Sequence, residues 1–247
     1  MAPKTDAPTM AQDRELLLWW EDFYLPIFEY VLGEVGDLRG KRVLELGCGE
    51  GGTSVLLAKR GASVVGIDLL DFRLDAARER VAQHKVGDAV QFALMDGMQL
   101  GFDDNTFDLI ISKSVLVFTD HAVIARECYR VLKPKGKAVF IENMQGHPAI
   151  QLYRKLFLRY SANLHYFSIG DIENMRQYFD HIQHREFHIL AIGALVWQKV
   201  FGLKSLYQIT FRGLGACDKR LLKWFPRLNQ FCWITAMICS KHTPKPL

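Results

Sequence analysis

Short runs of consecutive apolar residues alternate along the chain with longer segments in which apolar residues recur every three or four positions. The short runs predict buried strands, and the periodic segments predict amphipathic helices. The predicted strands lie at 43–46, 62–68, 90–94, 107–112, 138–143, 183–190 and 231–241. The predicted helices between them include 53–60, 72–83, 121–132 and 148–160. Strands and helices in alternation specify an α/β fold with a doubly wound, mostly parallel sheet.

The segment Lys41–Ser54 carries the strongest chemical signal. It reads K-R-V-L-E-L-G-C-G-E-G-G-T-S, which is a strand, four glycines within six residues and the start of a helix. Glycines let a backbone approach a ligand closely, and a helix N-terminus offers unpaired N–H donors, so the segment predicts a cofactor-binding turn. Gly47, Gly49 and Gly52 also satisfy G-x-G-x-x-G, which keeps a dinucleotide oxidoreductase open as an alternative. Glu45 would repel a pyrophosphate at the mouth of this turn but would accept a cationic ligand.

The sequence E-L-G-C-G-E-G resembles motif I of the class I S-adenosylmethionine-dependent methyltransferases. The passages F-D-D-N-T-F-D and L-K-P-K-G-K resemble further hallmarks of that family, which extend the resemblance over about 41–143. The resemblance implies a seven-stranded Rossmann-like sheet with an antiparallel last strand and helices on both faces. It also implies that S-adenosyl-L-methionine is the cofactor. The implied cofactor-binding residues are Glu45, Gly47, Cys48, Gly49, Gly51, Asp68, Leu69, Asp96, Gly97, Met98, Ser112 and Lys113.

Two of these residues have a defined expected role. Asp68 ends the second predicted strand, 19 residues after Gly49, near the spacing at which an acid accepts the ribose hydroxyls in βαβ nucleotide sites. Asp96 follows the third strand, and the resemblance assigns it, with Gly97 and Met98, to the adenine. The glycines of the turn would admit the methionine part.

The acceptor side is less well defined by the sequence. Many small-molecule methyltransferases carry a histidine or glutamate a few residues after the fourth strand, but here Val117 and Phe118 occupy those places. His147, which follows the fifth strand, and His121 are therefore the candidate general bases, because histidine titrates near neutral pH. Positioning of the acceptor alone could also supply the rate enhancement. The candidate acceptor-pocket residues are Trp20, Tyr24, Glu142, Asn143 and His165.

Composition and cysteine spacing narrow the protein class. The chain has 247 residues, of which 49% are apolar and 23% charged, as in an ordinary globular protein. Five cysteines without a C-x-x-C pair predict neither a disulfide framework nor a zinc site, so we expect no metal. No apolar run approaches the roughly 20 residues of a membrane-spanning helix. We therefore expect a cytoplasmic protein that could lie peripherally at a membrane.

Charge is distributed unevenly. Residues 187–247 contain nine Lys/Arg and one acidic residue, which leaves 22 basic and 26 acidic residues in 1–186. Within this basic part, about 191–230 form an apolar, aromatic insertion between the last two strands. The insertion could line the acceptor pocket, form a dimer interface or lie on an anionic membrane. Nucleic acid is not an expected partner, because the basic segment is too apolar for a phosphate-binding groove.

The expected organisation is a single methyltransferase domain over 1–247. Its parts are N-terminal lid helices in 1–40, a cofactor-binding core in 41–143 and an acceptor side in 144–247. We expect transfer of a methyl group to a small, hydrophobic or aromatic acceptor, with O-, N- and C-methylation all open. One alternative is a lipid-like acceptor at a membrane surface. Another, from a different class, is a protein that binds S-adenosylmethionine without turnover.

Overall fold

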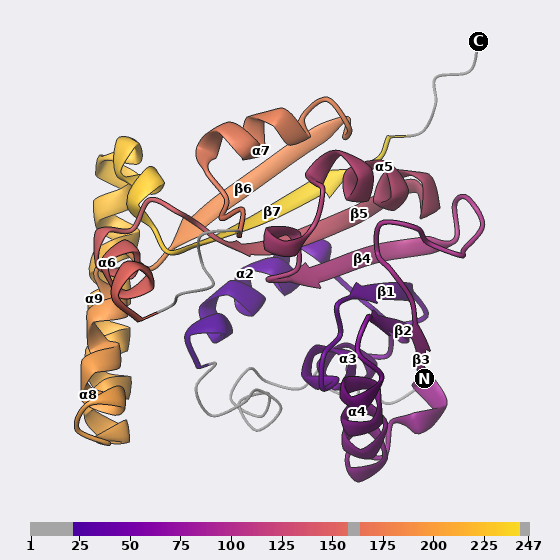
Figure 1. Ribbon diagram of the computed structural model, residues 1–247, viewed down its shortest axis with the longest axis horizontal. Helices are drawn as coiled ribbons and strands as arrows, with labels where there is room; N and C mark the ends of the chain where they lie inside the picture. Colours follow the sequence, from indigo (N-terminus) through magenta and orange to yellow (C-terminus); the bar gives the residue numbers. More distant parts are fainter. Residues whose placement is uncertain (1–21, 158–163, 243–247) are drawn as a thin grey trace, which may run out of the picture.

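A computed structural model describes residues 22–157 and 164–242 of the protein. It contains one seven-stranded sheet with the order β3-β2-β1-β4-β5-β7-β6 (Figure 1). The first five strands pair in parallel, whereas β7 runs antiparallel to both β5 and β6. The predicted doubly wound sheet with an antiparallel last strand is thereby confirmed. The strands are β1 Arg42–Leu46, β2 Ser63–Asp68, β3 Val90–Leu94, β4 Phe107–Lys113, β5 Leu132–Asn143, β6 His181–Phe187 and β7 Ile234–Ser240.

Helices cover both faces of the sheet, as expected. The apolar sides of α2 (Leu25–Val35) and α3 (Gly52–Ala58) pack on one face, together with Val81 of α4 (Asp71–Gln83). On the other face lie α5 (His121–Val131) and α7 (Ile169–Met175), which contribute Ile124, Cys128 and Ile172 to a second core. Short 3-10 segments complete the core at η2 Gly87–Ala89 and η3 Leu116–Phe118.

Several element ends differ from the sequence prediction, and β5 begins at Leu132 rather than at 138. Pro26 lies in the first turn of α2, directly after the 3-10 segment η1 (Asp22–Tyr24), where a helix tolerates proline. Strand β6 ends at Phe187 because His188 adopts a left-handed φ of 66°. Strand β7 begins at Ile234 because Pro226–Phe231 forms the 3-10 segment η6. Trp20 and residues 158–160 of the predicted helix lie outside the described residues.

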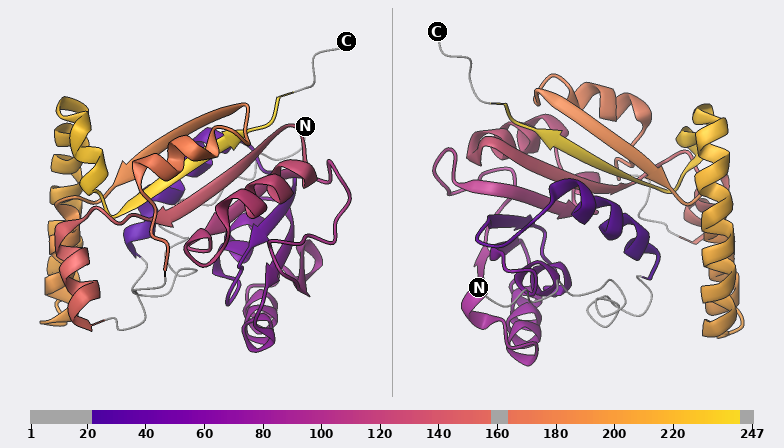
Figure 2. Two further views of the ribbon diagram at one scale, coloured as in Figure 1. Left: turned by 45° about the horizontal axis from the view of Figure 1, so that its top comes forward. Right: turned by 180° about the vertical axis from the view of Figure 1, so that it is seen from behind.

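The insertion between β6 and β7 folds into helices. These are η5 (Ala191–Ala194), α8 (Leu195–Lys199) and the 21-residue α9 (Lys204–Trp224). Together with α6 (Pro148–Phe157) they stand beyond one end of β6 and β7 rather than on a sheet face, as Figures 1 and 2 show. Among the residues described, none of the helices combines the length and apolarity needed to cross a bilayer.

The only acidic side chain in the basic C-terminal part anchors this helical layer. Asp218 of α9 is buried and accepts backbone N–H bonds from Ile189, Leu190 and Ala191 at 2.8–3.2 Å. The Asp218 carboxylate is therefore hydrogen-bonded inside the protein, at the N-terminus of η5, and is not part of the exposed charge. The exposed charge of residues 187–242 is consequently all basic.

Candidate active site

The carboxyl ends of four parallel strands meet at one edge of the sheet. Leu46, at the end of β1, pairs with Ile67 of β2 and with Ser112 of β4. Asp68, at the end of β2, pairs with Leu94 at the end of β3. Strand order reverses between β1 and β4, and the crevice outside such a reversal is where open α/β sheets bind ligands. The register therefore brings most of the predicted cofactor-binding residues to a single edge.

The glycine turn after β1 is built from left-handed backbone. Gly47, Gly49 and Gly51 have φ values of 62°, 52° and 77°. A Cβ on Gly47 would lie 2.4 Å from Val115 Cγ2, and one on Gly51 would lie 3.0 Å from Ala77 Cβ, whereas nothing lies within 4 Å of one on Gly49. Gly47 and Gly51 are thus required by packing and conformation, while Gly49 leaves open space beside the turn. That space is what a bound ligand would use.

Glu45 is a buried carboxylate directly beneath this turn. It is 4% exposed, and the Ser54 hydroxyl at the start of α3 donates a short hydrogen bond to its Oε2. Burial raises the pKa of Glu45 to about 7, against the lowering effects of Ser54 and of Lys113 nearby. A carboxylate held in this way is stabilised by a cation, which fits the ammonium group of a bound amino acid and disfavours a pyrophosphate.

Asp68 and Asp96 close the neighbouring strand ends. Gly49 and Leu70 donate backbone N–H bonds to the two Asp68 oxygens at 2.9 and 3.0 Å, so this carboxylate also fixes the glycine turn. Asp96 accepts an N–H bond from Met98 at 2.8 Å and remains partly exposed. Leu69, directly after Asp68, is 65% exposed. Two carboxylates and an exposed apolar side chain match the needs of a nucleoside, with a ribose diol and a flat base.

Cys48 and Gly97 contribute chiefly through their backbone and size. Cys48 is buried, its N–H donates to Ile67 O at 2.9 Å, and burial raises the pKa of its thiol strongly. The space beside Gly97 is limited by Ile124, 3.5 Å from where a Cβ would stand. Neither residue offers a reactive side chain. The carboxylates at this edge nevertheless fit S-adenosylmethionine: one can face its ammonium group, a second its ribose and a third its adenine base.

A polar cluster lies at the carboxyl end of β4. The Ser114 hydroxyl lies 3.0 Å from Tyr24 Oη and accepts a hydrogen bond from Asn143 Nδ2 at 3.0 Å. The Lys113 ammonium stands 4.9 Å from the centre of the Tyr24 ring. Ser112 is fully buried, and among the described residues its hydroxyl has no hydrogen-bond partner. Residues of η1, of β5 and of the loop after β4 therefore bring Tyr24 and Asn143, two of the candidate acceptor-pocket residues, together at Ser114.

Ser114 joins these two residues, and it follows the fourth strand, where the family resemblance places Ser112, Lys113 and Ser114 beside the reacting methyl. Its φ of 58° is unusual for a side chain other than glycine. The sequence S-K-S-V does not predict this backbone conformation. The sequence feature that points to Ser114 is its position directly after a buried parallel strand.

Glu142 is bound by the loop that follows β4. It is fully buried, and its Oε1 accepts N–H bonds from Val115 and Leu116 at 3.1 Å each. Burial raises the pKa of Glu142 to about 7. The contacts of Oε1 hold the β4–η3 loop against β5, whereas Oε2 has no hydrogen-bond partner among the described residues, so the role of Glu142 in the acceptor pocket stays a prediction.

His147 also has a structural role. It is 5% exposed, its Nε2 donates to Ile189 O at 2.9 Å, and its Nδ1 accepts the Ile150 N–H at 3.4 Å. Both ring nitrogens are therefore engaged with backbone, and the ring joins the start of α6 to the β6–η5 connection. The expected general base at His147 is not supported by these contacts, because a base needs a free nitrogen lone pair.

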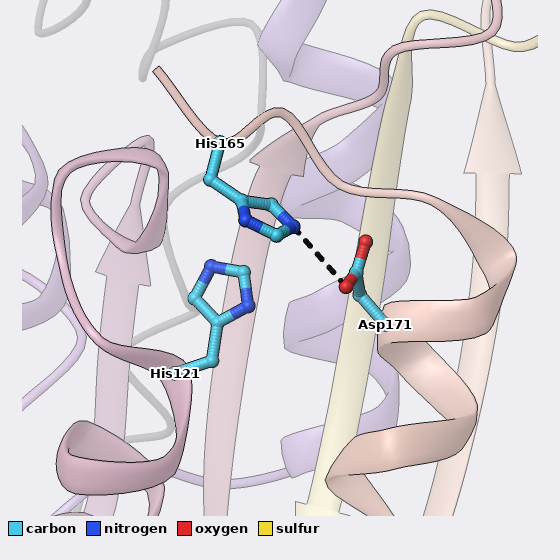
Figure 3. A group of neighbouring side chains, drawn as sticks. All are labelled: His121, His165 and Asp171. Atoms are coloured by element: carbon cyan, nitrogen blue, oxygen red, sulfur yellow. Dashed lines mark hydrogen bonds and ion pairs between the residues drawn. The ribbon is translucent and has the colours of Figure 1, made fainter. Parts of the chain in front are cut away.

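His121 and His165 lie side by side (Figure 3). Their ring centroids are 4.6 Å apart, and His165 Nε2 lies 3.2 Å from Asp171 Oδ1. His121 Nε2 is 3.0 Å from Leu116 O, and its ring also contacts Phe167 at 4.4 Å between centroids. Burial, and then the neighbouring His165, lower the pKa of His121. Asp171 also forms a capping box with Ser168 at the start of α7.

A separate cavity of about 570 Å³ lies between α2, β6 and α9. None of the residues expected to hold the cofactor lines it. Residues of α9 such as Phe211, Lys219 and Leu222 form one wall, and Glu186 and His188 form another. The insertion therefore walls a cavity, but this cavity is not at the carboxyl edge of β1–β4, and the expectation that the insertion lines the acceptor pocket stays a prediction.

Comparison with known proteins gives a consistent result. Residues 44–140 match the family model described as a methyltransferase domain. Over 156 residues the chain is 31% identical to a ubiquinone biosynthesis O-methyltransferase of Pseudomonas aeruginosa, and the match covers 59% of this chain and 66% of that protein. It is 29% identical over 134 residues to a demethylmenaquinone methyltransferase of Lactococcus lactis, with 53% and 52% covered. The chain thus spans between half and two thirds of the length of these relatives.

A solved structure extends the similarity beyond the matched segment. The geranyl diphosphate C-methyltransferase of Streptomyces coelicolor A3(2) superposes with a TM-score of 0.64 at 14% identity and covers 96% of this chain and 88% of that one. At this level of identity the similarity concerns the fold alone. The fold therefore includes β6, β7 and the helices between them, which lie outside the family model.

Proposed function

We propose that this chain, which belongs to the class I S-adenosylmethionine-dependent methyltransferases, transfers the methyl group of S-adenosylmethionine to a small, hydrophobic or aromatic acceptor. The observation that carries the proposal is the single edge at which Glu45, Asp68 and Asp96 lie at or within two residues of the ends of three neighbouring strands, with open space at Gly49. In this proposal residues 41–143 hold the cofactor, and the segments before and after them bind the acceptor.

Each cofactor contact follows from an atom already described. The Glu45 carboxylate would face the ammonium group of the methionine part, close to the open backbone at Gly49. Asp68 would exchange part of its backbone hydrogen bonding for the ribose hydroxyls, since a carboxylate oxygen can accept more than one hydrogen bond. Asp96 would accept a hydrogen bond from the adenine amino group, and Leu69 and Met98 would lie on the two sides of the base. Bound S-adenosylmethionine supplies an electrophilic methyl group on a sulfonium with a good leaving group.

The protein's contribution at the acceptor is positioning. Tyr24, Ser114 and Asn143 form a connected set of hydroxyl and amide groups, with Lys113 beside them. A hydroxylated aromatic ring suits this set, because its oxygen can accept a hydrogen bond while the ring packs on the Tyr24 side chain. The ammonium of Lys113 would favour the anionic form of such an oxygen. Among the described candidates, His121 and His165 have imidazoles that could receive the released proton.

The relatives support an acceptor of this class. The ubiquinone and demethylmenaquinone methyltransferases are named for quinone-type acceptors, of which the first is an O-methyltransferase. The decisive assay incubates the full chain with S-adenosylmethionine and three acceptors: a hydroxylated quinone precursor, a demethylmenaquinone analogue and an ethanolamine phosphate. Release of S-adenosylhomocysteine with a methylated aromatic product supports the proposal. Turnover of the amine alone contradicts it, and cofactor binding without any turnover favours a non-catalytic protein.

A second candidate, a lipid-like acceptor taken from a membrane surface, is favoured by the helical layer beyond β6 and β7. Exposed apolar side chains on its helices include Val200 at 68%, Ile209 at 70% and Trp224 at 76%. Lysines and arginines are interspersed among them, and the only acid of this segment is buried. Exposed apolar and basic residues on one helical layer match the interface of an anionic bilayer.

Flotation with liposomes tests this candidate. The full chain should float with vesicles of phosphatidylglycerol and phosphatidylcholine, less with phosphatidylcholine alone, and less after Ile209→Glu. Equal recovery in the pellet with both vesicle types would remove the membrane candidate and leave the methyltransferase proposal untouched. In that case the exposed apolar layer is better explained by a homodimer, which sedimentation velocity would detect.

A further inference from the structure

Three side chains from distant parts of the chain converge beside the acceptor side of the sheet. His121 begins α5, His165 precedes α7, and Asp171 lies in the first turn of α7 (Figure 3). One ligand atom from each, two imidazole nitrogens and a carboxylate oxygen, lies within 4.8 Å of the others. Among the described residues, no other group of three or more His, Cys, Asp or Glu side chains meets this condition.

Two of the three ligand residues, His121 and Asp171, are oriented by a neighbour. His121 Nε2 donates to Leu116 O at 3.0 Å, which fixes the neutral tautomer and leaves the Nδ1 lone pair free to bind a cation. In Figure 3 the other nitrogen of that ring points toward Asp171. The Ser168 N–H and hydroxyl donate to Asp171 Oδ2 at 2.8 and 2.6 Å, so Oδ1 is the oxygen turned toward the histidines. Such second partners of the ligand residues are characteristic of metal sites in proteins.

The distances fit a four-coordinate cation after a small movement. Ligands at about 2.0–2.1 Å from a tetrahedral Zn²⁺ stand about 3.3 Å from one another. His165 Nε2 and Asp171 Oδ1 are already 3.2 Å apart. The other distances between ligand atoms are at most 4.8 Å. To reach the tetrahedral spacing, side-chain rotations must bring these atoms closer by at most about 1.5 Å. His165 is 62% exposed and is free to make this movement.

We propose that His121, His165 and Asp171 form a binding site for a divalent transition-metal ion of the zinc class, with a fourth position open to water. Two imidazoles and one carboxylate are the ligand set of open zinc sites, and nitrogen ligands select against Mg²⁺ and Ca²⁺. The ligands are 44 and 50 residues from His121 along the chain, so no short spacing in the sequence reveals them. The inference does not depend on the proposed methyl transfer, but with the metal bound His121 and His165 would be ligands and would not receive the released proton.

Zinc titration of the full chain tests the proposal directly. The parent carries Cys217→Ser, because Cys217 is the exposed cysteine and its thiol would compete for zinc. Isothermal titration at pH 7.5 should give one Zn²⁺ per chain. His165→Gln and His121→Gln should each weaken binding at least about ten-fold, the low end of the loss seen even for second-sphere changes. The control His181→Gln removes an exposed histidine at the start of β6 and should leave the affinity unchanged.

Cobalt provides a readout of geometry that does not depend on activity. Tetrahedral Co²⁺ gives intense visible absorption, which the parent should show and Asp171→Asn should lose. Because His165 is mostly exposed, His165→Gln should fold normally, and its melting temperature without metal should equal that of the parent. Absence of a saturable one-to-one site, or an unchanged zinc affinity in His165→Gln, would overturn the proposal and leave a hydrogen-bonded His165–Asp171 pair.

Discussion

Glu45→Gln should have opposite effects on stability and on cofactor binding. In the folded protein burial raises the pKa of Glu45 from its ordinary 4.5 to about 7. Between these values the unfolded carboxyl has released its proton while the folded one retains it, so this group's contribution to stability falls as pH rises and levels off above pH 7. At about 1.4 kcal/mol per pH unit, the total is about 3 kcal/mol, most of it between pH 5 and pH 8.

Glutamine has the shape of the protonated acid and does not titrate. The variant should therefore gain stability relative to the wild type as the pH rises. In urea unfolding, the difference between their free energies of unfolding (Glu45→Gln minus wild type) should be about 2–3 kcal/mol larger at pH 8 than at pH 5. Any fixed cost of burying the amide cancels in this comparison, as does the raised pKa of Glu142, which both proteins share. The same substitution should weaken S-adenosylhomocysteine binding at pH 8 by about 2 kcal/mol, or about 30-fold, because the ammonium loses a buried carboxylate.

Glu50→Gln is the matched control. Glu50 lies in the same turn but is exposed, 3.6 Å from Arg80, so its removal should change neither quantity appreciably. A stability difference for Glu45→Gln that does not vary with pH would refute the assignment of a buried, neutral carboxyl. An unchanged affinity would refute its role toward the ammonium group.

Three further substitutions test other parts of the site. Gly51→Ala should lower the free energy of unfolding, measured in urea, by about 1–3 kcal/mol, because its φ of 77° and the 3.0 Å approach to Ala77 both oppose a Cβ. The control Gly33→Ala, on the open face of α2, should not lower it. His147→Ala should lower the melting temperature yet leave kcat unchanged, and a fall in kcat with unchanged stability would restore it as the base. Ser114→Ala should raise KM for the acceptor and leave KM for S-adenosylmethionine unchanged, and equal changes in both would contradict an acceptor-side role.

The strands of the cofactor half could be predicted because each is a short, continuous apolar run closed by a polar or glycine residue. Asp68 and Asp96 were found in this way, and the register brings their strand ends together. The ends of β6 and β7 were less predictable. Strand β6 ends where His188 adopts a left-handed backbone conformation, which a histidine in the sequence does not predict. Strand β7 begins only after the 3-10 segment η6.

The histidines show where sequence reasoning fails. A histidine before a proline suggested an exposed loop base, yet His147 is buried because Ile189 and Ile150, from two separate elements, supply partners for its ring. The contacts of Glu142 were likewise not predictable, because the backbone N–H groups that donate to its Oε1 come from the β4–η3 loop. Such contacts depend on tertiary packing between distant segments, which periodicity and spacing do not encode.

The central claim is that the edge formed by β1, β2 and β3 binds S-adenosylmethionine through Asp68. Isothermal titration of S-adenosylhomocysteine into the full chain, into Asp68→Asn and into the exposed-acid control Asp75→Asn measures it directly. One saturable site is expected, with affinity unchanged in Asp75→Asn and at least about ten-fold weaker in Asp68→Asn, since hydrogen bonds to a charged group contribute about 1.5–3 kcal/mol each. Equal affinity in all three proteins, or tighter binding of NADH than of S-adenosylhomocysteine, would contradict the account.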